Sequence, residues 1–146
     1  MLDPEHKRIA LDSNVLIYLL EGQGRLAEAA AGIVDSIDSG DRDAVMSAIS
    51  LTEILAGPAI AGDAQAFELT AEALRDSRIE VVPLDGATAE DAAWIRGSIG
   101  VSLADSIHLA TARNADATAF VTNDRRIRPI PRLSVVLLAD LAGDTP

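Results

Sequence analysis

Four acidic residues stand where a chain of alternating strands and helices could bring them together. Asp12 and Asp124 each close a short apolar segment, whereas Glu53 and Asp105 fall near the start of two expected helices. Two carboxylates ~4 Å apart repel by about 4 kcal/mol at an effective dielectric constant of 20, so converging acids retain a proton or need a cation. Oxygen ligands without histidine or cysteine favour Mg²⁺ or Mn²⁺ over Zn²⁺, and Mg²⁺ commonly works beside a phosphate. The acids therefore point to phosphoryl chemistry.

Each acid also has a purely structural interpretation. Ser50 stands three residues before Glu53, and Ser102 three residues before Asp105, which is the spacing of a helix capping box. The other two acids could cap a helix or close a turn. The metal-site interpretation therefore depends on whether the fold brings the four together.

Apolar runs rich in β-branched residues alternate with stretches of helical period, a pattern typical of an α/β fold with a mainly parallel sheet. We predict strands at Arg8–Leu11, Ala44–Ala48, Ile79–Pro83, Ala119–Thr122 and Ser134–Leu138. We predict helices at Val15–Leu20, Ala27–Ser39, Leu51–Leu55, Asp63–Asp76, Ala89–Ser98 and Leu103–Asn114.

This arrangement predicts where the acids lie. The carboxyl ends of parallel strands share one edge, where ligands bind, so we expect Asp12, Glu53 and Asp124 to face a common space. Asp105 is harder to place, because we expect a helix that precedes a strand to begin at the opposite edge.

Length and composition exclude several classes of protein. The 146 residues, 49% of them hydrophobic, predict one domain over 1–146 with loose ends at 1–5 and 143–146. The absence of cysteine fits a cytoplasmic protein, and no apolar run reaches the ~20 residues of a membrane span. A net charge of −11 and 3% aromatic residues argue against nonspecific coating of single strands.

Four segments in this order resemble the PIN-domain ribonucleases, and among them the VapC-type toxins of toxin–antitoxin pairs. They are Leu-Asp-Ser-Asn-Val-Leu-Ile at 11–17, Thr-Glu-Ile at 52–54, Leu-Ala-Asp-Ser-Ile-His-Leu-Ala at 103–110 and Val-Thr-Asn-Asp-Arg-Arg at 121–126. No single segment is specific, but together they span nearly the whole chain. Ile127 departs from the pattern, since many relatives carry an aromatic residue there, and we attribute this to packing.

The resemblance implies a three-layer fold with a five-stranded sheet of order 3-2-1-4-5. It implies that Asp12, Glu53, Asp105 and Asp124 surround one or two Mg²⁺ or Mn²⁺ ions, so that the helix start bearing Asp105 does reach the site. It further implies hydrolysis of RNA to 5′-phosphate and 3′-hydroxyl ends, an antitoxin partner of the VapB type and pairing into a homodimer.

Several polar residues beside the acids are candidates for supporting roles. The resemblance matches Ser13 to a small hydroxyl position next to the first acid and Thr122 to a hydroxyl that braces it. Asn14 and Asn123 could bind a metal-held water or simply form turns. The basic cluster that follows the last acid could be a solvated loop, or it could contact RNA phosphates through Arg125, Arg126 and Arg128.

Other residues receive structural interpretations. His108 follows Asp105 by one helical turn and could act as a general base, but we interpret it as a polar residue on a half-exposed helix face. We interpret Trp94 as core filler with its indole N–H at the surface. His6 lies in the expected loose end. The apolar stripe of Phe67, Ala71 and Leu74 is core or a dimer contact.

Two other functions compete with a nuclease. Phosphatases and receiver domains that form an aspartyl-phosphate also place an aspartate after a parallel strand, but they use a lysine from a late strand, whereas Lys7, the only lysine, precedes the first. Ser13 as a covalent nucleophile lacks an adjacent histidine in sequence. A noncatalytic PIN-like binding module would not require all four acids.

Overall fold

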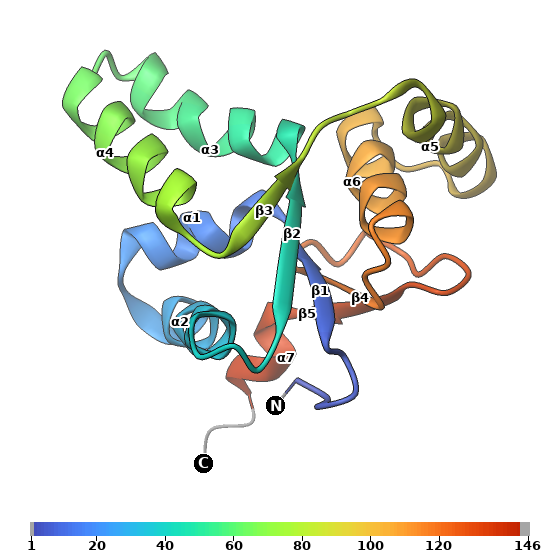
Figure 1. Ribbon diagram of the computed structural model, residues 1–146, viewed down its shortest axis with the longest axis horizontal. Coiled ribbons are helices and arrows are strands. Elements are labelled where there is room, and N and C mark those ends of the chain that lie inside the picture. The colour runs from blue at the N-terminus through green and yellow to red at the C-terminus, as the bar shows by residue number, and fades with distance from the viewer. Residues whose placement is uncertain (1, 144–146) are drawn as a thin grey trace.

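The computed structural model describes residues 2–143 and has a five-stranded, all-parallel sheet of order β3-β2-β1-β4-β5 (Figure 1). The predicted strand order is confirmed. The strands are β1 (Arg8–Leu11), β2 (Asp43–Ser47), β3 (Ile79–Val82), β4 (Ala119–Thr122) and β5 (Ser134–Leu137).

The central strand β1 positions the site. Ile9 pairs with Ala44 of β2 and with Ala119 of β4, and all three side chains are buried. The amide of Asp12 continues this ladder by donating to the carbonyl of Val121 (2.9 Å). The end of β1 is therefore fixed beside the end of β4.

Seven helices of the described chain surround the sheet. Helices α1 and α2 pack together with α7 nearby, while α5 and α6 form a pair on the opposite face (Figure 1). Helices α3 and α4 form a hairpin that reaches away from the sheet (Figure 1). Their bounds are α1 (Ser13–Glu21), α2 (Gly24–Asp38), α3 (Ala48–Ile60), α4 (Ala64–Asp76), α5 (Gly86–Ile99), α6 (Leu103–Asn114) and α7 (Leu138–Ala142).

Helix α3 differs most from its prediction, which was wrong at both ends. Its N-cap is Ser47, whose hydroxyl accepts a hydrogen bond from the amide of Ser50 (3.1 Å), so the predicted capping role of Ser50 is wrong as well. The helix also continues through Gly57 and Pro58. Pro58 has no N–H to donate to the carbonyl of Ile54, so the helix loses one hydrogen bond there. The carbonyls at its end are satisfied by the amides that follow, such as that of Asp63, which donates to Pro58.

The start of α6 lies at the carboxyl edge of the sheet, contrary to our pattern-based expectation. A crossover helix runs antiparallel to the strands that it connects. Helix α6 ends just before Ala119, which pairs with Ile9 near the amino end of β1, so the residues at its start lie at the other edge. The direction of α6 therefore brings Asp105 toward the other acids, as the family resemblance implies.

The expected loose end at 1–5 is wrong for residues 2–5. Leu2 is buried, and the guanidinium of Arg42 donates to the carbonyls of Leu2, Asp3 and His6. At the other end, Gly143 caps α7 by donating to the carbonyl of Ala139. Residues 1 and 144–146 of the expected loose ends lie outside the described residues.

Two apolar features differ from expectation. Trp94 is 79% exposed, so its assignment as core filler is wrong; α5 packs through Thr88, Ala92 and Ile95 instead. In the stripe on α4, Ala71 and Leu74 are buried in the interior of this chain, whereas Phe67 is half-buried. Among residues 2–143, no helix has the length and apolarity needed to cross a bilayer.

Candidate metal-binding active site

Asp12 is the most buried of the four predicted acids and caps α1. Its Oδ1 accepts hydrogen bonds from the amide (2.8 Å) and hydroxyl (3.4 Å) of Ser13, and its Oδ2 accepts from the hydroxyl of Thr122 (2.7 Å). The side-chain amide of Asn14 also donates to Oδ2 (3.3 Å). The carboxylate is thus fixed in one orientation by groups from β4 and α1.

Two asparagines connect this carboxylate to the neighbouring loop. The Oδ1 of Asn14 accepts from the amide of Asn123 (3.1 Å), and the Oδ1 of Asn123 accepts from the amide of Ala139 (3.1 Å). The hydroxyl of Thr122 accepts from the amide of Asp124 (3.1 Å). These contacts give both asparagines a structural role in joining β1, β4 and α7.

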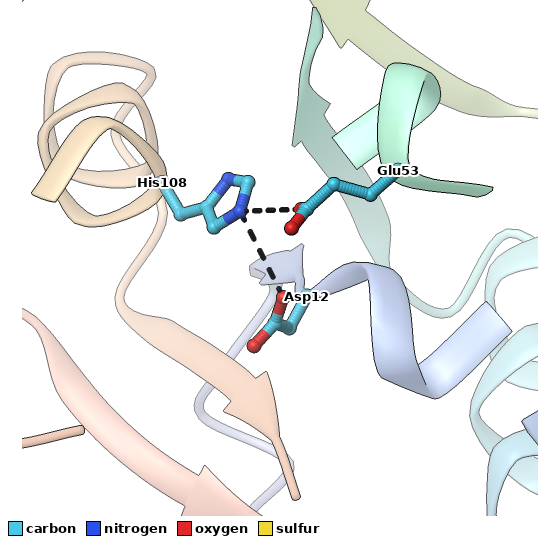
Figure 2. A group of neighbouring side chains, drawn as sticks. All are labelled: Asp12, Glu53 and His108. Carbon is cyan, nitrogen blue, oxygen red and sulfur yellow. Dashed lines mark hydrogen bonds and ion pairs between the residues drawn. The ribbon is translucent and has the colours of Figure 1, made fainter. Parts of the chain in front are cut away.

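Glu53 reaches Asp12 from helix α3. Because α3 begins one turn earlier than predicted, Glu53 lies in its second turn rather than its first. Its side chain is 40% exposed and extends toward the end of β1 (Figure 2). The two carboxylates therefore approach one space from different elements, as the parallel sheet predicts.

His108 lies between these acids, and our interpretation of it as half-exposed is wrong. Its side chain is 1% exposed, with Nε2 2.8 Å from Oε1 of Glu53 and 3.9 Å from Oδ1 of Asp12 (Figure 2). Its Nδ1 lies 2.7 Å from the hydroxyl of Ser47 and 3.3 Å from that of Ser50. Both ring nitrogens thus contact polar side chains, of which Ser47 and Ser50 are buried and Glu53 is partly exposed.

Asp105 and Asp124 stand at the border of this group. Within residues 2–143, the acidic and histidine side chains that place ligand atoms within 4.8 Å of one another are Asp12, Glu53 and His108. Asp105 is near enough for its charge to raise the pKa of Asp12. The carboxylate of Asp124 is held by the guanidinium of Arg126 in two hydrogen bonds (3.0 and 2.9 Å).

The family model for the PIN domain matches residues 9–133, which include β2, β3 and β4, all of β1 except Arg8, the four acids and His108. The chain belongs to the PIN domain family. Among curated proteins, none matches it significantly.

Three solved structures illustrate the fold that this chain shares. A toxin–antitoxin complex from Klebsiella pneumoniae superposes with a TM-score of 0.69 at 22% identity, covering 89% of this chain and 97% of that one. VapBC2 from Rickettsia felis, bound to a promoter DNA fragment, gives 0.72 at 15% identity with 89% and 98% covered. VapBC-1 from nontypeable Haemophilus influenzae gives 0.61 at 18% identity with 90% and 98% covered.

Electrostatics in this PIN domain favour a cation beside Asp12. Burial raises the pKa of Asp12, and the charge of Asp105 adds to this, whereas the hydrogen bond from Thr122, the charge of His108 and the amide of Ser13 lower it. The net direction is upward, so the buried site disfavours the carboxylate when no cation is present. Two carboxylates and an imidazole are a donor set that fits a divalent metal ion.

The three arginines of the basic cluster are all exposed, but one of them is paired with an acid. Arg126 forms an ion pair with Asp124 and lowers its pKa, chiefly through the side-chain hydrogen bonds. Arg126 and Arg128 line a cavity of about 300 Å³ together with Asp105, so positive charge adjoins the acidic group.

Sequence reasoning missed His108 and its two serine partners. The signal in the sequence was the run from Ser106 to Ala112, which contains no Asp, Glu, Lys or Arg and is buried throughout in α6. A helix segment buried on all sides leaves no half-exposed face for a histidine, so a polar ring there needs polar partners. Ile127 is buried against the α5–α6 face, in agreement with a packing role.

Proposed function

We propose that this PIN domain is a Mg²⁺- or Mn²⁺-dependent endoribonuclease and the toxin of a VapBC-type toxin–antitoxin pair. The observation that carries the proposal is the convergence of Asp12 and Glu53 in a buried site, with Asp105 at its border, in a chain of the PIN domain family. Action on cellular RNA would place the protein in the cytoplasm.

Each side chain has a distinct part in this proposal. Asp12 and Glu53 would hold the cation, while Asp105 would add negative charge beside it and Asp124 would stand at its border, paired with Arg126. Thr122 and Ser13 orient the carboxylate of Asp12 through the hydrogen bonds described above. A divalent cation in this position supplies Lewis acidity, which polarises the scissile phosphate and activates the attacking water.

Substrate binding would come from the arginines next to the acids. The chain carries a net charge of −11, which repels a polyanion at long range. Arg125 and Arg128 offset this charge locally because they are exposed near the carboxyl edge of the sheet. We therefore assign them contacts with RNA phosphates on either side of the cleaved bond.

The assignment as a toxin draws on two observations. Structures with this fold include toxin–antitoxin complexes. In addition, α1, α2 and α4 border an apolar groove of about 350 Å³, which suits a short amphipathic segment of an antitoxin.

The aspartyl-phosphate alternative is not favoured by the structure. Lys7 precedes β1 and therefore lies at the amino edge of the sheet, opposite the carboxyl edge that bears Asp12. The lysine cannot bind a phosphoryl group on that aspartate.

The test is incubation of the purified protein with total RNA, with and without Mg²⁺ or Mn²⁺, followed by mapping of the cut ends. We expect metal-dependent cleavage that leaves 5′-phosphate and 3′-hydroxyl ends and is absent from an Asp12→Asn control. A folded protein that binds RNA without cutting it under any of these conditions would instead be a noncatalytic binding module.

A further inference from the structure

His108 places a ring nitrogen where the proposed cation would lie, and acidic residues alone do not account for it. Its Nε2 points into the space between Glu53 and Asp12 (Figure 2). We propose that His108 is a direct nitrogen ligand of the cation and that this ligand makes the site prefer Mn²⁺ over Mg²⁺. The inference rests on the proposed function, because it concerns the same cation.

The distances between the donor atoms suit a common cation. Nε2 is 2.8 Å from the Glu53 oxygen and 3.9 Å from the Asp12 oxygen, and the three atoms all lie within 4.8 Å of one another. An octahedral cation with bonds of about 2.1 Å holds neighbouring ligands about 3 Å apart and opposite ligands about 4.2 Å apart. The side chains therefore need only small adjustments to share one ion.

The partners of Nδ1 allow the ring to present an unprotonated Nε2. A histidine that binds a metal donates its other ring N–H to a nearby acceptor. Ser47 and Ser50 supply two buried hydroxyls at Nδ1, and a hydroxyl both donates and accepts. A partner that only donates, such as a backbone amide, would force the proton onto Nε2 and prevent metal binding.

The same hydroxyls also fit the cation-free protein. In one ring tautomer, Nε2–H donates to Glu53 and Nδ1 accepts from Ser47 or Ser50. With a cation bound, the other tautomer would carry the proton on Nδ1, where a serine hydroxyl would accept it, and Nε2 would present its lone pair to the ion.

The donor chemistry sets the metal preference. Imidazole is a good ligand for transition metals and a poor one for Mg²⁺, which prefers oxygen and retains its waters. Asp124 does not compete with His108 for this coordination position, because the carboxylate of Asp124 is paired with Arg126. The nitrogen thus replaces one of the oxygens that an all-carboxylate site would offer to Mg²⁺.

The experiment is pulsed EPR of the full chain loaded with Mn²⁺, with natural-abundance and ¹⁵N-labelled histidine. The matched control is His6→Gln, because His6 is the only other histidine and bonds to Thr118 away from the site. We expect nitrogen coupling to Mn²⁺ in the wild type and in His6→Gln, and its loss in His108→Gln. Calorimetric titration should show the ratio of Mn²⁺ to Mg²⁺ affinity falling by about tenfold in His108→Gln.

Mn²⁺ that binds to the wild type without coupling to a histidine nitrogen overturns the inference and leaves the nuclease proposal standing. If His108→Gln does not fold, as judged by circular dichroism, coupling that persists in His6→Gln still assigns the ligand to His108. A folded wild type that binds neither ion and cuts no RNA overturns both proposals, so the two failures are distinguishable.

Discussion

The hydroxyl of Thr122 lies 2.7 Å from Oδ2 of Asp12, although the two residues are 110 positions apart in the chain. This hydrogen bond joins the ends of β4 and β1 and fixes the carboxylate that faces the candidate metal site. It also lowers the pKa of Asp12 against the larger effect of burial. The threonine thus favours the ionised form that a cation needs.

Replacing Thr122 with valine should weaken metal binding without unfolding the protein. Loss of a group that orients a metal ligand typically costs 10- to 100-fold in metal affinity or activity, and we expect a loss in that range. Calorimetric titration with Mn²⁺ measures it.

The matched control is Thr111→Val. The hydroxyl of Thr111 is buried and has no hydrogen-bond partner in the described part of the chain. Its removal should leave metal affinity unchanged and raise the free energy of unfolding by about 1 kcal/mol. Equal metal affinity in Thr122→Val and wild type would show that the hydrogen bond to Asp12 is irrelevant to binding.

Asp12→Asn should abolish cleavage and yet make the metal-free protein more stable at neutral pH. We expect activity to fall by more than about 100-fold, the upper limit for loss of an outer partner of a metal ligand. Stability should rise because burial raises the pKa of Asp12 in the folded state. The ionised carboxylate of Asp12 therefore lowers the free energy of unfolding, and a neutral asparagine side chain at this position does not.

The sign of the pH dependence follows from this shift. A raised folded pKa gives a contribution to stability that is complete below the unfolded pKa and is lost as pH rises through the folded value. In EDTA, the advantage of Asp12→Asn should therefore be absent at strongly acidic pH and grow through the range between the two pKa values. Chemical unfolding at several pH values tests this, and an advantage that shrinks with rising pH would contradict it.

The arginines should differ in their contributions to RNA binding. Each phosphate contact on a single strand contributes about 0.7 to the slope of log affinity against log salt concentration. We expect the variant with Arg125→Ala and Arg128→Ala to lose about 1.4 from this slope. Arg126→Ala should lose less, because Arg126 is paired with Asp124, and it should return the pKa of Asp124 toward its ordinary value.

The control for this series is Arg78→Ala. Arg78 is exposed and immediately precedes β3, at the amino edge of the sheet, where it donates to the carbonyl of Asp38. Binding to a single-stranded RNA in Mg²⁺-free buffer, measured over a range of salt concentrations, provides the slopes. A wild-type slope in the variant lacking Arg125 and Arg128 would mean that the cluster is only a solvated loop.

The fold was predictable because its signals are local. Runs such as the one ending at Leu11 alternate with helical periods, and parallel strands bring their carboxyl ends to one edge. Asp12 and Glu53 could be placed from this rule alone. The partners of His108 could not, since Ser47, Ser50 and Glu53 are 55 to 61 residues away and their approach depends on where α3 begins.

Trp94 shows a different limit of sequence reasoning. Residue type favoured burial, but the face of α5 that packs inward is set by Thr88, Ala92 and Ile95, and Trp94 is not on it. At this position, helical spacing indicates which residues are buried better than the hydrophobicity of the tryptophan side chain does. Five-residue α7 was also absent from our prediction, because so short a helix shows no period.

The homodimer is still a proposal, but a different surface now supports it. Ala71 and Leu74 of the α4 stripe are buried, but the α3–α4 hairpin exposes Ile60 (87%) and Leu69 (60%). We therefore place the proposed contact with a second copy on this hairpin. Sedimentation at micromolar concentration should give a dimer for the wild type and a monomer for Leu69→Glu, and a wild-type monomer would rule this contact out.

The antitoxin should bind through both an apolar helix and a cationic side chain. The groove is lined by Leu16, Leu19 and Leu20 of α1 together with residues of α2 and α4, and Leu20 is 56% exposed. A segment that folds into this groove would gain affinity from apolar burial. An arginine at its end could engage the carboxylates of Asp12 and Glu53, where the cation otherwise binds.

Co-expression with the protein encoded beside this chain should therefore yield a complex in which RNA cleavage is blocked and is partly restored as Mn²⁺ is raised. Leu20→Glu should prevent capture of the partner while leaving cleavage by the free protein unchanged, because this side chain belongs to the groove and not to the acidic site. Leu84→Glu, at an exposed position outside the groove, should still capture the partner. If no small protein co-purifies, or if one does and cleavage is unchanged, the toxin assignment is wrong and a free-standing PIN nuclease remains.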